Sequence, residues 1–183
     1  MKTLFIILMI IILSFTGCKK DTYPSNLNPT ENEAPSTPID EIGPENLEGT
    51  LVGMYIDVID RLWETDPGLN GEDVKKIGFN LSELTNLTKE EKEQLIDIVA
   101  EKYEREPLVG TFDELSKEGY IAGVEGWSDG ILITIKVTKV GKDNFTFDAT
   151  KWRSGDGAYY FFNCKGILKD GSWSYRIGEE AIS

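Results

Sequence analysis

Apolar positions between residues 51 and 62 repeat with the period of a helix. Leu51, Tyr55, Val58 and Leu62 recur at intervals of three or four residues, which places them on one face of an amphipathic helix. The spacing predicts a helix over residues 50–64, closed by the turn sequence DPG at 66–68.

A Thr-x-x-Glu pattern, which caps the first turn of a helix, occurs twice after this segment. The two pairs are Thr88 with Glu91 and Thr111 with Glu114. The first pair predicts a helix over residues 89–104, which Pro107 keeps from continuing. The second predicts a short helix that ends at Gly119. Residues 75–84 are expected to form a short strand or a loop.

From residue 127 onward the apolar period changes to two. Residues 131–140, ILITIKVTKV, alternate Ile and Val on one face with Thr and Lys on the other, as a half-buried strand does. The segments NFTFDAT, GAYYFFNCKGIL and WSYRIG predict three more strands, with Asp170-Gly171 as a type I′ turn before the last. The order of elements predicts an α+β domain: N-terminal helices packed on a C-terminal antiparallel β-meander.

The first residues have the layout of an export signal. Residues 4–12 are uninterrupted apolar residues after the positive charge of Lys2. The apolar run reaches only ~18 Å as a helix, against a bilayer core of ~30 Å. It ends in Phe15-Thr16-Gly17-Cys18, which resembles the lipobox of bacterial lipoproteins, with Phe15 in place of the usual aliphatic residue. The pattern predicts a signal peptide over residues 1–17 and a lipidated Cys18; the alternative is a buried helix or an uncleaved anchor.

Residues 18–48 combine the proposed lipidated cysteine with a proline-rich segment. Five of the seven prolines fall there, among small polar and charged residues. Such a composition buries too little apolar surface to offset the entropy of ordering, so we expect a disordered tether. Residues 49–183 then form a single α+β domain.

Composition excludes several functions. The chain has 32 acidic and 19 basic residues, a net charge of -13, so we expect no nucleic-acid partner. It has no histidine, which excludes catalytic triads and zinc sites that need imidazole. Beside Cys18 it has only Cys164, which we expect to pack within a strand. We expect no cofactor and no metal site, and a membrane attachment through the lipid on Cys18.

Two polar segments are candidate sites. In DATKWRSGDG, Asp148, Trp152 and Arg153 surround a glycine-rich turn, where the guanidinium and the indole could bind a ligand or a partner. The alternative is a structural Asp148–Arg153 pair with a packed Trp152. Residues 63–73 gather oxygen ligands that suit Ca²⁺ but lack the spacing of an EF-hand, so a polar turn is favoured there.

Two resemblances extend these inferences. The ending DGSWSYRIG, after helices and a meander, resembles the NTF2-like fold. The segments LWETDPGLN, FDATKWRSGDGAYYFFNCKG and GEEAIS resemble a family of small, uncharacterised Gram-positive lipoproteins. That family has no established activity, so the resemblance implies no catalytic residues.

The favoured hypothesis is a lipid-anchored protein of the cell membrane, facing outside the cytoplasm, that acts as a non-enzymatic binding or interaction module. One alternative is an NTF2-like small-ligand-binding protein or enzyme that uses carboxylates such as Asp148 for acid–base chemistry. A second alternative is an immunity or exclusion lipoprotein.

Overall fold

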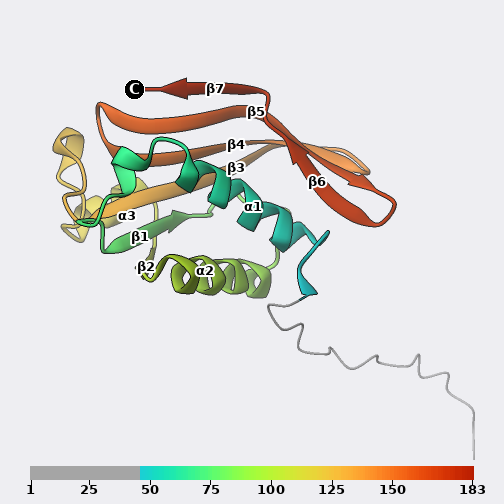
Figure 1. Cartoon of the computed structure of the whole chain (residues 1–183), viewed down its shortest axis with the longest axis horizontal. Helices are drawn as coiled ribbons and strands as arrows, with labels where there is room; N and C mark the ends of the chain where they lie inside the picture. The colour runs from blue at the N-terminus through green and yellow to red at the C-terminus, as the bar shows by residue number, and fades with distance from the viewer. Residues whose placement is uncertain (1–45) are drawn as a thin grey trace, which may run out of the picture. The chain divides into compact units, whose positions relative to one another are not determined.

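The computed structural model describes residues 46–183, which form three α-helices and seven strands (Figure 1). The helices are α1 (Leu51–Glu64), α2 (Lys89–Tyr103) and α3 (Phe112–Lys117). The strands are β1 (Lys76–Asn80), β2 (Glu106–Val109), β3 (Gly130–Val140), β4 (Asn144–Ser154), β5 (Gly157–Lys169), β6 (Ser172–Arg176) and β7 (Glu179–Ile182). Short 3₁₀ turns occupy Pro67–Asn70 and Gly123–Glu125. The α+β fold class predicted from the sequence is confirmed.

The strands form one curled, mixed sheet in the order β2-β1-β3-β4-β5-β6, with β7 paired to β5. The segment from β3 to β6 is the antiparallel meander that the alternation predicts. The parallel part of the sheet was missed: β1 is parallel to both β2 and β3, with Ile77 opposite Pro107 and Ile131. The expected meander therefore accounts for only part of the sheet.

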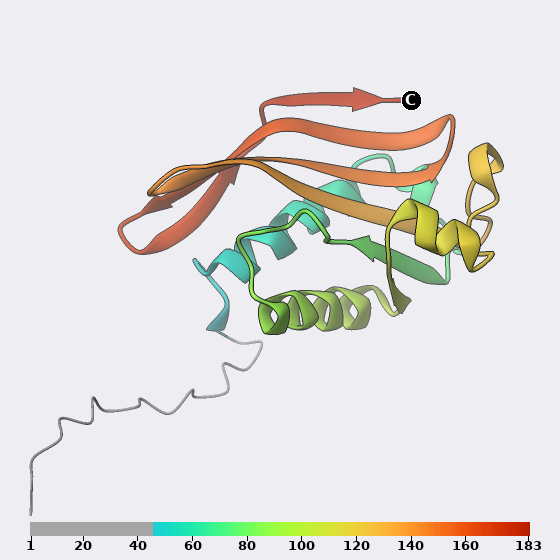
Figure 2. The ribbon, with the colours of Figure 1, turned by 180° about the vertical axis from the view of Figure 1, so that it is seen from behind.

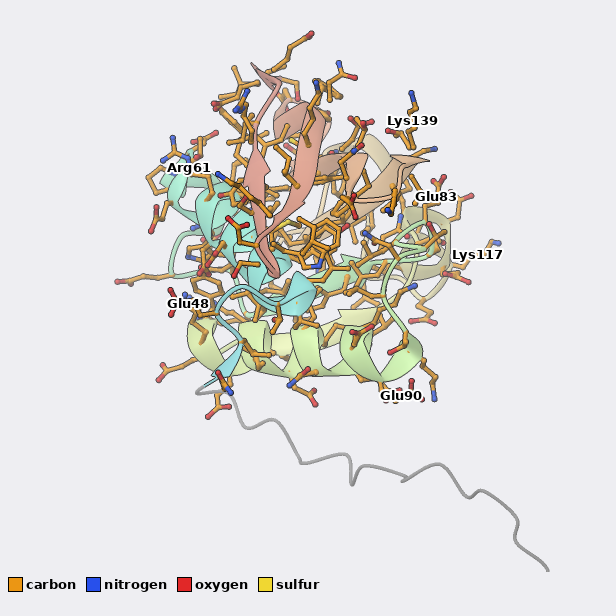
Figure 3. All side chains as sticks on the ribbon, turned by 90° about the vertical axis from the view of Figure 1, so that its right-hand side faces the viewer. Glu48, Arg61, Glu83, Glu90, Lys117 and Lys139 are labelled. Carbon is orange, nitrogen blue, oxygen red and sulfur yellow. The ribbon has the colours of Figure 1, made fainter. Side chains whose placement is uncertain are left out.

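Helices α1 and α2 cover the inner face of the sheet, where most of the core lies. Alternate residues of the central strands point to this face, including Ile133, Ile135 and Phe147, all fully buried. Tyr55, Val58 and Leu62 of α1 are also fully buried against them. The apolar faces that the sequence predicts for the helix and the strands therefore pack against each other in one core. Figure 3 shows charged side chains such as Arg61, Glu90 and Lys139 projecting outward from this packed interior.

Helix α3 lies on the opposite, outer face and covers only one end of it. Leu115 of α3 packs with Ile121, Trp127 and Leu132 in a second, smaller cluster. Gly78 of β1 faces this cluster, because a Cβ there would come within 2.8 Å of the Trp127 ring. Figure 1 shows α1 in front of the strands and Figure 2, from behind, shows α3 in front of them. The rest of the outer face has no helix over it among residues 46–183.

Strand β5 bends in its middle, so that two different strands pair with its two halves. Residues 165–169 pair with β6 and residues 159–162 pair with β7. At the bend, Asn163 has a left-handed backbone, with φ of 52°. The expectation that WSYRIG is the last strand was wrong, because the chain turns at Gly178 and continues into β7.

Local sequence signals set several element ends as predicted. Both Thr-x-x-Glu pairs form complete capping boxes, at the starts of α2 and α3. Asp170 and Gly171 both have positive φ, 53° and 82°, as a type I′ turn requires. Two hydrogen bonds also connect the α1 region to β6. The backbone N–H of Trp173 donates to the Gly49 carbonyl at 2.7 Å, and the Tyr175 hydroxyl donates to the Asp57 carbonyl at 3.2 Å.

The predicted signal peptide, Cys18 and nearly all of the tether lie outside the described residues. Leu47, which the sequence assigned to the tether, is buried in the core, and its carbonyl accepts a bond from the Thr50 N–H at 3.0 Å. Within residues 46–183, no helix is both long enough and apolar enough to cross a bilayer.

Candidate functional site

The three candidate residues Asp148, Trp152 and Arg153 lie within strand β4, not on a connection between strands. Successive residues of a strand point to opposite faces. Asp148 and Trp152 therefore lie on the outer face, whereas Arg153 points to the inner face. The structure does not bring the three side chains into one site.

Arg153 has a structural environment. Its guanidinium forms an ion pair with Asp73 and donates hydrogen bonds to the carbonyl of Ser128 at 3.0 Å and of Leu69 at 3.3 Å. The guanidinium lowers the pKa of the Asp73 carboxyl through this hydrogen bond. The Asp148–Arg153 pair considered from the sequence is not formed. Arg153 instead fastens the loop after α1 to the sheet.

Asp148 supports the bend in β5. Its Oδ1 accepts a hydrogen bond from the backbone N–H of Asn163 at 2.9 Å. The register shift at this point removes Asn163 from the regular ladder between β4 and β5, and an unpaired N–H would be costly. Asp148 supplies the missing acceptor, so its carboxylate has a structural partner.

Trp152 is packed on one side and partly exposed on the other. It contacts the outer cluster of Leu115, Trp127 and Leu132. Its ring also meets the edge of Phe112, with centroids 5.0 Å apart and planes at 78°. Of the three predicted residues, Trp152 alone keeps an aromatic surface available to a partner.

Two further aromatic side chains, on the neighbouring strand β5, share the outer face with Trp152. Tyr160 and Phe162 of β5 are partly exposed, and their rings stack with centroids 5.5 Å apart and planes at 8°. Thr150 of β4 is directly opposite Tyr160, and Ala158 is opposite Trp152. We call Phe112, Trp152, Tyr160 and Phe162 the outer aromatic patch. Tyr160 was not singled out from the sequence, although the alternation along β5 could have placed it on the same face as Trp152.

The loop considered for Ca²⁺ is occupied by a cation of the protein itself. The ammonium of Lys151, whose side chain is fully buried, donates to the carbonyls of Thr65 at 2.5 Å and Asp66 at 3.1 Å. It also donates to Asn70 Oδ1 at 2.7 Å and reaches the Trp63 carbonyl at 3.4 Å. Because burial disfavours the charged form, the pKa of Lys151 is lowered to about 8. Alternation along β4 places Lys151 on the inner face with Phe147 and Ala149, a signal that sequence reasoning overlooked.

Cys164 behaves as the sequence predicted. It is fully buried on the inner face of β5. Burial raises the pKa of its thiol to about 11, which suppresses the nucleophilic thiolate at neutral pH. Cys164 is therefore a packing residue.

A cleft of about 670 Å³ opens between α2 and α3, at the carboxyl ends of the parallel strands β1 and β2. Residues from four separate segments line it: Phe79 to Ser82, then Lys89, Lys92, Glu93 and Ile96 of α2, then Val109 to Thr111, and Glu114 and Glu118. Crevices at this edge of parallel sheets commonly hold ligands. Sequence reasoning missed the cleft, because β2 and its parallel pairing were not predicted.

Comparisons of this chain with family models, with curated proteins and with solved structures found no match. The resemblances to the NTF2-like fold and to small Gram-positive lipoproteins therefore stay predictions.

Proposed function

We propose that the protein is a lipid-anchored binding module of the cell membrane that faces outside the cytoplasm and has no catalytic activity. Cys18 would carry the lipid, and the folded domain would bind a protein with a basic surface. The anchor is supported by the sequence Phe15-Thr16-Gly17-Cys18 after a short apolar run. Two or three acyl chains on one cysteine give stable membrane attachment, whereas one chain alone binds only marginally.

The outer aromatic patch is the observation that carries the binding role. Three of its rings lie on a sheet face that α1 and α2 do not cover, and the fourth, Phe112 of α3, packs on Trp152 and is 37% exposed. Aromatic residues are enriched at binding hot spots because they bury large areas with few rotatable bonds. Threonines at positions 134 and 150, paired across β3 and β4, offer hydroxyls beside the rings.

The negative net charge of the protein favours a partner with a basic surface. Removal of residues 1–17 would take away Lys2 and no acidic residue, so the net charge of -13 becomes -14. On the outer face, Glu179 of β7 lies opposite Phe162 in the ladder, at the border of the patch. A basic rim around an apolar centre would complement this arrangement and would accelerate association at low ionic strength.

The absence of catalysis is supported by the state of the reactive groups. The ammonium of Lys151 is fully committed to four oxygen atoms, and the thiol of Cys164 is buried. Asp148, which the alternative enzyme hypothesis would use, already accepts the Asn163 N–H. The inner face between sheet and helices is filled by core side chains.

The anchor is tested by Cys18→Ser. We expect the variant to remain as unprocessed precursor that incorporates no radiolabelled fatty acid, because the thiol is the lipid acceptor. The matched control is Cys164→Ser, which leaves the lipobox intact. Processing and acylation of Cys18→Ser at the wild-type level would contradict the proposal.

The patch is tested by photo-crosslinking of the anchored protein in intact cells. A photoreactive amino acid at position 160 should give a crosslinked band that weakens with added salt and disappears with Phe162→Ser. The same probe at the exposed Lys142, on the β3–β4 turn, is the control. Equal crosslinking from both positions, or a band insensitive to Phe162→Ser, would exclude the patch as the binding surface.

A further inference from the structure

We propose that the cleft between α2 and α3 binds a small zwitterion with an apolar side chain, the chemistry of a free α-amino acid. This site is separate from the outer aromatic patch and does not depend on it. The proposal rests on three features of the cleft: one cationic wall, one anionic wall and an apolar floor between them.

The sheet topology creates the cleft. Strand β1 leads through α2 into the parallel strand β2, so both strands end at the same edge of the sheet. The chain leaves β1 into residues 81–88 and leaves β2 into α3. The two connections diverge, and the space between them is the cleft, whose volume lies within the range of ~300–1,000 Å³ typical of small-molecule pockets.

Helix α2 supplies the cationic wall. Its cleft residues Lys89, Lys92, Glu93 and Ile96 are spaced as neighbours on one helix face. Lys89 is paired with Glu93 at 3.3 Å. The ammonium of Lys92 donates to the Leu81 carbonyl at 3.0 Å, and a lysine ammonium has three donors. Lys92 is partly buried and faces the cleft with donors to spare, which suits a ligand carboxylate.

The residues after β2 supply the anionic wall. Glu114 and Glu118 are four positions apart and both line the cleft. Glu114 is held in place by the Thr111 N–H at 2.8 Å and the Thr111 hydroxyl at 2.9 Å, both bonded to its Oε2. These bonds lower the pKa of the Glu114 carboxyl, so it stays ionised. A ligand ammonium would meet Oε1 of Glu114 and the exposed carboxylate of Glu118.

Apolar side chains lie between the two charged walls. Leu81 and Ile96 are 5% and 8% exposed, and Val109, at the end of β2, is 69% exposed. A ligand side chain over Val109 would remove this apolar surface from water. The two walls together favour a zwitterion, because a ligand with a single charge could form an ion pair with only one of them.

Binding can be measured on the full-length chain in detergent micelles, from methyl NMR spectra of leucine, isoleucine and valine. Titration with L-leucine should shift the methyl signals of Leu81, Ile96 and Val109. N-acetyl-leucine lacks the ammonium and leucinamide lacks the carboxylate, so each should bind at least tenfold more weakly than leucine. The dipeptide Leu-Leu separates the two sources of this chemistry: equal or tighter binding of the dipeptide assigns the site to peptide termini, and weaker binding assigns it to free amino acids.

Substitutions in each charged wall test whether that wall contacts the ligand. Glu118→Gln and Lys92→Met should each weaken leucine binding at least tenfold, whereas the exposed controls Glu101→Gln and Lys142→Met should leave it unchanged. If Lys92→Met disturbs folding through loss of the Leu81 bond, Glu118→Gln still decides, because Glu118 is exposed. The proposal is wrong if leucine shifts none of the cleft methyls, or if N-acetyl-leucine and leucinamide bind as tightly as leucine.

Discussion

Replacement of Lys151 by methionine should remove one part of the pH dependence of the free energy of unfolding. The folded chain holds Lys151 at a pKa of about 8, against 10.5 for an ordinary lysine, because its side chain is fully buried. Between these values the unfolded chain binds a proton that the folded chain lacks. The free energy of unfolding of the wild type therefore rises with pH in this window. This contribution is complete above pH 10.5 and is lost as the pH falls through 8.

The magnitude follows from the two pKa values. Between about pH 7.5 and about pH 9.5, the free energy of unfolding of the wild type should rise by about 2 kcal/mol relative to that of Lys151→Met. The variant should also be less stable at both pH values, because the oxygen atoms of Thr65, Asp66 and Asn70 lose their donor, at about 1–3 kcal/mol for each acceptor left buried and unpaired. Cys164 acts in the opposite direction: its raised pKa removes stability as the pH rises from 9.0 to about 11. Because Cys164 is present in both proteins, its effect cancels in the difference.

Urea unfolding of both proteins at the two pH values measures this difference. The exposed Lys142→Met is the matched control and should track the wild type. A wild-type advantage that stays constant between the two pH values would refute the reasoning. If Lys151→Met does not fold, NMR titration of the ¹³C-labelled lysine side chain in the wild type provides the same test, and an apparent pKa of 10 or more for Lys151 would contradict the lowering of its pKa by burial.

Three further substitutions test the packing of β4 and β5 by thermal and chemical unfolding. Arg153→Ala should destabilise the domain by about 1–3 kcal/mol, because it removes the Asp73 pair and two carbonyl partners; NMR should also show a rise in the pKa of Asp73. Trp152→Ala should cost about 2 kcal/mol, less than a fully buried aromatic residue, since one side of the ring is exposed. Gly166→Ala should cost about 1–3 kcal/mol or more, because the new Cβ would lie 2.2 Å from the Phe145 ring. Wild-type stability for any of these variants would contradict the packing described for that residue.

Local signals in the sequence were sufficient for the helices and the meander. Thr88 and Thr111 set the starts of α2 and α3 through capping boxes, which involve residues only three positions apart. The alternation in β3 and the Asp170-Gly171 turn also act over short distances. The parallel pairing of β1 with β2 is different, because the whole of α2 lies between the two strands in the sequence. In addition, neither strand is long enough to show a clear apolar period. Strand β7, EEAI, has no apolar alternation because all four of its residues are exposed.

The candidate sites were predicted less well, for a related reason. Asp148, Trp152 and Arg153 are close in sequence, but a strand directs adjacent side chains to opposite faces, so proximity did not make a site. Glycines 155 and 157 correctly indicated a turn, which lies at Gly155 and Asp156, but β4 runs through to Ser154, so all three candidate residues belong to the strand. The cleft joins residues of α2 with Glu114 and Glu118, which are at least eighteen positions away, and only the unpredicted strand β2 brings them together.

The bonds between α1 and β6 determine when the domain can become stable. The Tyr175 hydroxyl reaches a carbonyl 118 residues earlier in the chain, and the backbone N–H of Trp173 donates to the carbonyl of Gly49, two residues before α1. A chain made from its N-terminus therefore completes these contacts only after residues 173–175 have been added. Until then the apolar face of α1 lacks part of its cover. Contacts of such long range slow folding, so α1 is expected to gain its full cover late in folding.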